Sequence, residues 1–155
     1  MNRGQQPVFH ANRRLWRILR RCGRKKGPPP LLHLNIPKFP YFKEFAAEVM
    51  RRESIDCTFD WRYHSTARFF IKARVIRIGY ARLKECYQHS HYIPEWSRGT
   101  ELCRVMTGGQ PLLKARWVIL HELAHAKLVD HNFTDAHNKT FYKTLTQMAE
   151  NHLRK

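Results

Sequence analysis

The sequence predicts an α+β fold that combines a small antiparallel sheet with several helices. Residues 58–64 alternate between polar and aromatic side chains, which is the period of a half-buried strand. Before and after this stretch, apolar residues recur at spacings of three and four, which is the period of an amphipathic helix. A chain of 155 residues with 43% hydrophobic content is long enough for one domain with a modest core.

The first helix is expected over residues 39–53. Apolar side chains recur there with charged residues between them: Tyr41, Phe42, Phe45, Ala46, Val49 and Met50. Pro37 and Pro40 favour a helix start at this point, because proline fits the first turn of a helix but not its interior.

Two strands follow, and we expect them to pair as an antiparallel hairpin. The first covers residues 58–64, with Phe59, Trp61 and Tyr63 on one face. The second covers residues 67–78, which are rich in Phe, Ile and Val, and it ends at Gly79. The short polar stretch between the two segments is suited to the turn of a hairpin.

The segment after the hairpin gives weaker signals. Residues 81–87 are compatible with a short helix, and residues 88–98 are typical of a loop. Residues 101–107, which precede Gly108 and Gly109, are expected to form a third strand.

Two helices complete the predicted fold. Pro111 is placed for the first turn of a helix over residues 112–129. The last helix begins at Asp135 or Asn138 and ends near residue 153. Phe141, Leu145 and Met148 form its apolar stripe.

Positive charge is concentrated at the N-terminus. The chain has 29 Lys and Arg against 12 Asp and Glu, a net charge of +17. Nine of the basic residues lie in the first 27 positions: Arg3, Arg13, Arg14, Arg17, Arg20, Arg21, Arg24, Lys25 and Lys26. A stiff Gly-Pro-Pro-Pro break at residues 27–30 follows, so we divide the chain into a basic arm, residues 1–30, and a domain, residues 31–155. The remaining 20 basic residues still exceed the 12 acidic ones by 8.

Such an excess indicates a polyanionic partner, and we expect the arm to contact nucleic acid through Arg13, Arg14, Arg17, Arg20, Arg21, Arg24, Lys25 and Lys26. A membrane surface and a mitochondrial transit peptide are the alternatives. Transit peptides are usually rich in serine, whereas the first serine of this chain is Ser54.

The sequence argues against an integral membrane protein and against secretion. No run approaches the roughly 18 apolar residues of a membrane span, and no apolar segment follows the N-terminal charges as in a signal peptide. The four cysteines, Cys22, Cys57, Cys86 and Cys103, contain no C-x-x-C pair, so we expect reduced thiols rather than a disulfide framework or a four-cysteine zinc site. An intracellular protein, cytoplasmic or nucleoid-associated, is expected.

Residues 121–125 are a candidate metal site, because they read His-Glu-Leu-Ala-His, the H-E-x-x-H pattern. Residues four apart on a helix lie on one face, so His121 and His125 can reach one metal ion. Glu122 lies slightly off that face and can reach a water on the metal without being a ligand. Exposed polar residues on a surface helix are the alternative. Apolar neighbours on both sides make it less favourable, since His and Glu are costly to bury without a role.

A catalytic zinc site needs a third protein ligand and one open position. Three residues after the motif qualify. His131 has the metzincin spacing, but Leu128 occupies the position where that family turns at a glycine. Glu150 and His137 lie on or next to the last predicted helix, and the spacing alone does not choose among the three.

The segment from residue 121 to residue 142, HELAHAKLVDHNFTDAHNKTFY, resembles the SprT-like and YgjP-like zincin metallopeptidases. Those families follow H-E-x-x-H with a third histidine in the pattern H-(G/S/N)-x-x-F-(W/Y), which residues 137–142 match. The resemblance implies Zn²⁺ held by His121, His125 and His137, with Glu122 as the general base. It also implies a zincin-like fold: a helix, a small antiparallel sheet, an active-site helix and a closing C-terminal helix.

The function that the resemblance implies is peptide-bond hydrolysis by a zinc-activated water. Some SprT-like relatives act on DNA-associated proteins, and the basic arm favours the same kind of substrate here. Tyr87, Tyr92, Tyr142 or an arginine is available to stabilise the oxyanion. The alternative function is a basic nucleic-acid-binding protein whose zinc site is structural or non-proteolytic.

Overall fold

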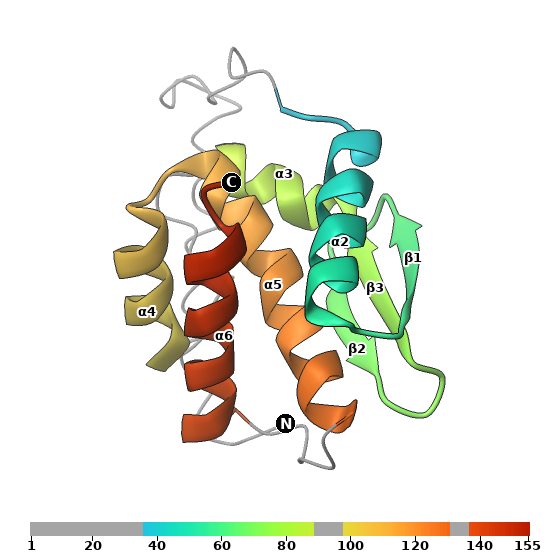
Figure 1. Cartoon of the computed structure of the whole chain (residues 1–155). Coiled ribbons are helices and arrows are strands. Elements are labelled where there is room, and N and C mark those ends of the chain that lie inside the picture. The colour runs from blue at the N-terminus through green and yellow to red at the C-terminus, as the bar shows by residue number, and fades with distance from the viewer. Residues whose placement is uncertain (1–35, 89–97, 131–136) are drawn as a thin grey trace, which may run out of the picture.

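The computed structural model describes residues 36–88, 98–130 and 137–155 (Figure 1). The basic arm, residues 1–30, lies outside the described residues, as do residues 89–97 of the loop predicted over residues 88–98; the two end positions of that loop belong to helices. Within the described ranges, a three-stranded sheet and surrounding helices confirm the α+β class.

The helix at the centre of the fold is α5, Pro111–Asp130, which confirms the helix predicted from residue 112. It contacts two of the strands and four other helices, and Figure 1 shows the sheet on one side of it and α6, Lys139–His152, on the other. A helix surrounded in this way is apolar on most sides, and Trp117, Leu120 and Leu123 are fully buried.

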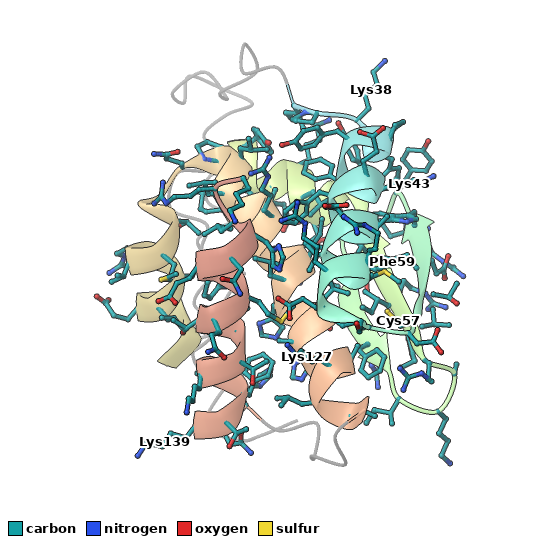
Figure 2. All side chains as sticks on the ribbon, viewed as in Figure 1. Lys38, Lys43, Cys57, Phe59, Lys127 and Lys139 are labelled. Atoms are coloured by element: carbon teal, nitrogen blue, oxygen red, sulfur yellow. The ribbon has the colours of Figure 1, made fainter. Side chains whose placement is uncertain are left out.

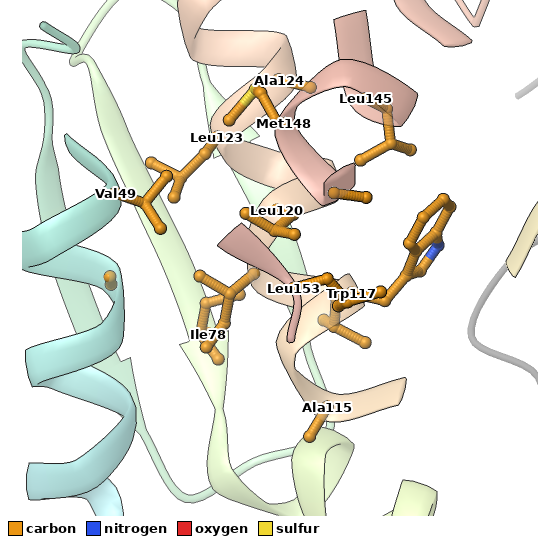
Figure 3. Close-up of a cluster of buried hydrophobic side chains, with 14 of the residues drawn as sticks. Val49, Ile78, Ala115, Trp117, Leu120, Leu123, Ala124, Leu145, Met148 and Leu153 are labelled. Carbon is orange, nitrogen blue, oxygen red and sulfur yellow. The ribbon is translucent and has the colours of Figure 1, made fainter. Parts of the chain in front are cut away.

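The core lies where α5 meets its neighbours. Figure 3 shows Leu123 of α5 between Val49 of α2, Phe39–Glu53, and Met148 of α6, with Leu120 beside them. Both flanking helices were predicted from their apolar spacing, and both are confirmed. In α2, Pro40 occupies the first turn as expected.

The sheet consists of β1, Thr58–Arg62, β2, Ala67–Phe70, and β3, Val75–Gly79, in the order β1-β3-β2. The predicted antiparallel hairpin of two strands is therefore wrong in two respects. The segment expected to be one strand over residues 67–78 is two strands, β2 and β3, which pair with each other antiparallel. The first strand pairs parallel to β3 rather than antiparallel to its sequence neighbour, so the sheet is mixed.

Local backbone geometry explains both corrections. The chain reverses at residues 71–74, where Arg74 adopts a left-handed conformation with φ 53° and its N–H donates to the carbonyl of Ile71. Between β1 and β2 the chain passes close to the end of β3. A Cβ on Gly79 would lie 1.4 Å from the carbonyl oxygen of His64, so only glycine fits there.

The third predicted strand, residues 101–107, is also wrong, because these residues belong to helix α4, Arg98–Thr107. Cys103 and Thr107, one helical turn apart, are both fully buried, and the Thr107 hydroxyl donates to the Cys103 carbonyl at 2.6 Å. Gly108, with φ +60°, follows the last residue of the helix. The short helix predicted over residues 81–87 is confirmed as α3, Tyr80–Gln88.

The described residues also bear on two features considered from the sequence, membrane-spanning segments and the state of the cysteines. None of the helices described is long and apolar enough to cross a membrane. Cys57, Cys86 and Cys103 are reduced cysteines outside any disulfide, as expected, whereas Cys22 falls outside the described ranges.

Candidate metal centre

Helix α5 carries two histidines one turn apart on its side facing β2. His121 is half-buried and His125 is only 6% exposed. Because α5 is held by packing on several sides, these two imidazoles project from the most constrained helix of the fold.

The third histidine is delivered by the start of α6. Asn138 is the N-cap residue of this helix, and its side-chain oxygen accepts a hydrogen bond of 2.9 Å from the backbone N–H of Phe141. His137 immediately precedes this cap, so the cap fixes the backbone from which its imidazole extends. The asparagine of the H-N-x-x-F-Y pattern is thus a capping residue.

The three imidazoles meet through their Nε2 atoms. The Nε2 atom of His121 lies 3.2 Å from that of His125 and 3.1 Å from that of His137, and the remaining pair, His125 and His137, is 3.0 Å apart. Among the described residues, these three are the group whose nitrogen atoms converge closely enough to hold a metal ion.

Hydrogen bonds among the three rings cannot account for this triangle. A ring nitrogen of a neutral imidazole either carries a hydrogen or presents a lone pair. Of three such atoms, two must be of the same kind, so at least one of the three short distances joins two N–H groups or two lone pairs. A cation at the centre, with three lone pairs directed at it, removes this conflict.

The donor set also fits the dimensions of a zinc site. Zn–N distances of about 2.0–2.1 Å in a tetrahedron separate two donors by about 3.3–3.4 Å. The separations of 3.0–3.2 Å between the three Nε2 atoms are close to this value. Three nitrogen donors leave the fourth tetrahedral position open, as in catalytic zinc sites.

The ring of Phe141 contacts all three imidazoles. Its side chain is fully buried, and its ring stacks on His125 with the centroids 4.3 Å apart. The centroids of His121 and His137 each lie 5.0 Å from the same ring in edge-on contacts. An apolar ring in this position limits the orientations of all three imidazoles.

A cleft of about 540 Å³ opens beside the histidines. Glu122, which is 7% exposed, lines it together with the three imidazoles, and the consecutive residues 67–73 form the opposite wall. Successive side chains of a strand point to opposite faces, so a cleft lined by every residue of β2 runs along the edge of that strand. No described strand pairs with this edge of β2.

A partly buried ion-pair cluster links α2, α5 and α6. The Glu53 carboxylate accepts hydrogen bonds from Lys127 at 2.6 Å and from His152 at 2.7 Å. Lys127 lies on α5 between the flanking helices, as Figure 2 shows. Burial by itself raises the pKa of Glu53, but the hydrogen bonds from Lys127 and His152 outweigh burial and lower that pKa.

The other residues considered from the sequence lie elsewhere. His131 and Tyr92 fall outside the described ranges. Glu150 is exposed near the C-terminal end of α6 and is not part of the cluster of donors. Tyr87 is buried, and burial raises its pKa, but it does not line the cleft. Tyr142 lies closest, with its ring centroid 6.3 Å from that of His137.

Sequence reasoning missed two parts of the site. Phe141 was recognised as a core residue and as part of a motif, but its contact with all three imidazoles is visible only in three dimensions. The wall formed by residues 67–73 left no signal, because it comes from a strand about 50 residues earlier in the chain.

Comparison of the chain with protein-family models, with curated proteins and with solved structures finds no match in any of the three.

Proposed function

We propose that the protein is a zinc-dependent metallopeptidase of the SprT-like zincin kind. In this proposal His121, His125 and His137 hold the zinc ion and Glu122 is the general base. The observation that carries the proposal is the triangle of three Nε2 atoms in a cleft that also contains a buried glutamate.

The chemistry of the donors supports zinc. Three neutral imidazoles suit a borderline cation such as Zn²⁺, whereas Mg²⁺ and Ca²⁺ prefer oxygen ligands. Three histidines with one open position are found in catalytic zinc sites, while structural sites usually use four protein ligands. No acidic or sulfur donor among the described residues joins the three nitrogens.

The proposed mechanism assigns one role to the metal and one to the carboxylate. Zinc, when bound, lowers the pKa of water and polarises the scissile carbonyl. Glu122 accepts the proton of the attacking water and then passes it to the leaving amine. The position of Glu122 next to a proposed ligand, inside the cleft and almost closed to solvent, suits a base that acts at the metal.

The edge of β2 supports a peptide as the substrate. A strand edge presents backbone N–H and C=O groups that an extended peptide can pair with. Because the cleft runs along this edge, a peptide paired with β2 would pass in front of the three histidines.

We further propose that the substrates are associated with DNA, which the basic arm would bring to the enzyme. The support is the arm's nine positive charges, together with the SprT-like motif. The competing function, a nucleic-acid-binding protein with a non-proteolytic zinc site, shares the arm and the histidines. It differs because it does not require Glu122 as a general base.

The decisive variant is therefore Glu122→Gln, which keeps the size of the side chain but removes the base. We expect the zinc-loaded protein to cleave an unfolded protein such as reduced, alkylated lactalbumin, free or in the presence of DNA. Loss of a general base should lower the rate by about 10²–10⁴. Zinc content, measured by mass spectrometry of the metal, should stay at one ion per chain.

Glu150→Gln is the matched control, because Glu150 is an exposed glutamate at the far end of α6. It should retain full activity. Activity that persists in Glu122→Gln would refute the mechanism. Stoichiometric zinc without any proteolysis by the unaltered protein would favour the non-proteolytic alternative.

A further inference from the structure

The wall of the metal cleft formed by β2 and the turn after it, residues 67–73, is positively charged. Arg68 and Lys72 are exposed and line the cleft, and Glu122 is the sole acidic residue among its described lining residues. Glu122 lies on the opposite wall and is buried beside the histidines. The two cations therefore face a cleft whose described lining has no carboxylate near the solvent to balance them.

The sheet behind this wall does not supply the missing negative charge. Arg68 is directly opposite Arg77 in the β2–β3 pairing, and both guanidinium carbons lie 4.9 Å from the ring centroid of Phe70. Asp60 is the one acidic residue of the three strands, and it is engaged by Arg62 and Arg77, at 2.9 Å each.

Among the described residues, no acidic side chain forms an ion pair with Arg68 or Lys72. Like charges placed directly opposite each other on neighbouring strands destabilise a sheet, and Asp60 offsets only the Arg77 side of this pair. An anion in the cleft would offset the charge of Arg68, which lines it.

A peptide paired with the free edge of β2 would bring its own side chains to this position. Side chains directly opposite on paired strands lie about 4.5–5.5 Å apart at Cβ, within reach of an ion pair. An Asp or Glu opposite Arg68 would then form an ion pair, and an acidic residue of the peptide beyond the end of β2 would lie near Lys72, which is in the turn after the strand. A Lys or Arg at either place would be repelled.

We propose that the enzyme selects substrates with acidic residues flanking the scissile bond, and that Arg68 and Lys72 determine this specificity. The inference rests on the proposed peptidase function and names its substrate class. Phosphates of a nucleic acid are also anions. A peptide is favoured because it alone uses the backbone groups of the β2 edge and reaches the carbonyl-polarising site at the same time.

The test compares two fluorescent peptides that differ only in charge, one with Glu and one with Lys on both sides of the same cleavage site. The cleavage site is first mapped in digests of reduced, alkylated lactalbumin. The Glu peptide should have the higher kcat/KM, by up to about fivefold for each exposed charge pair, mainly through a lower KM. The preference should shrink at about 1 M salt, where the screening length falls to about 3 Å.

Charge reversal by Arg68→Glu with Lys72→Glu should invert the preference without changing zinc content. Lys84→Glu, an exposed residue of α3 outside the cleft, is the control and should leave the preference unchanged. Binding of the same two peptides to the zinc-loaded Glu122→Gln protein, measured by fluorescence anisotropy, gives a readout that does not depend on turnover.

Three results would overturn the inference while leaving the peptidase intact. They are cleavage of both peptides at equal rates, a preference that survives charge reversal, and an equal loss for both peptides in Arg68→Glu. An oligonucleotide that competes only when Arg68 is present, with no effect of peptide charge, would assign the surface to nucleic acid instead. Failure of the zinc-loaded protein to cleave lactalbumin at all refutes the proposed function itself.

Discussion

The N-cap of α6 should control how tightly the metal is held. Asn138 accepts the Phe141 N–H at 2.9 Å and keeps an extended backbone, φ −103° and ψ −175°, between His137 and the helix. Replacing Asn138 with alanine removes the acceptor and leaves an N–H of the first turn without its partner. Substitutions of this kind cost about 1 kcal/mol.

The same cost should appear in zinc affinity. His121 and His125 project from α5, which does not depend on the cap, whereas the position of His137 follows from it. In the variant, zinc binding must itself order the backbone that the cap otherwise holds. The free energy of zinc binding should therefore become less favourable by up to about 1 kcal/mol, which raises the dissociation constant roughly fivefold.

Two measurements test this prediction. Competition with a chromophoric chelator gives the zinc dissociation constant, and urea unfolding of the metal-free protein gives the free energy of unfolding. Asn138→Ser is the matched control, since serine caps helices about as well as asparagine. It should restore both quantities nearly to those of the unaltered protein.

One result would refute the reasoning directly: Asn138→Ala with the expected loss of stability but unchanged zinc affinity. His137 would then be held independently of the cap. Equal losses of affinity in the alanine and serine variants would also contradict it, because they would assign the asparagine amide a role other than capping.

Three further predictions follow from the described contacts and the arm. Hydrogen bonds from Lys127 and His152 lower the pKa of Glu53 despite its burial, so its stabilising contribution is present above the ordinary glutamate pKa of about 4.3 and is lost as pH falls through the lowered value. Urea unfolding at a series of pH values should show this loss, and Glu53→Gln should flatten it; an unchanged profile would contradict the assignment. Burial raises the pKa of Cys86 to about 12, so alkylation mapped by mass spectrometry at neutral pH should modify Cys86 only after denaturation. Deleting residues 1–27 should weaken binding to duplex DNA and reduce the steepness of its salt dependence, whereas equal slopes would remove the arm's proposed role.

The elements predicted well are those whose signal is local. The apolar spacing of α2, α5 and α6 reports which side of each helix is buried, and the prolines at residues 40 and 111 mark two helix starts. Two metal-site histidines follow from spacing on one helix. The third histidine, His137, is predicted by the motif that contains Asn138. The helix cap that Asn138 forms is also a local feature.

The elements predicted wrongly depend on distant partners. Nothing within residues 58–64 states whether the strand runs parallel or antiparallel to its neighbour, because that choice is made by β3, which comes later in the chain. The segment 101–107 fits a strand or a helix, and burial of Cys103 and Thr107 against the rest of the fold decides for the helix. The charged wall of the cleft belongs to the same class of long-range features.

The mixed sheet also has a consequence for the order of folding. The β2–β3 pair is joined by a tight reversal, so it closes a very short loop and can form early. The parallel β1–β3 pair joins residues 17 positions apart, such as Thr58 and Val75, with β2 between them in sequence, so β1 has a template to dock on only after the hairpin exists. A cleft bordered by β2 is thus built on the part of the sheet that assembles first, and substitutions in β1 should change the unfolding rate more than the folding rate.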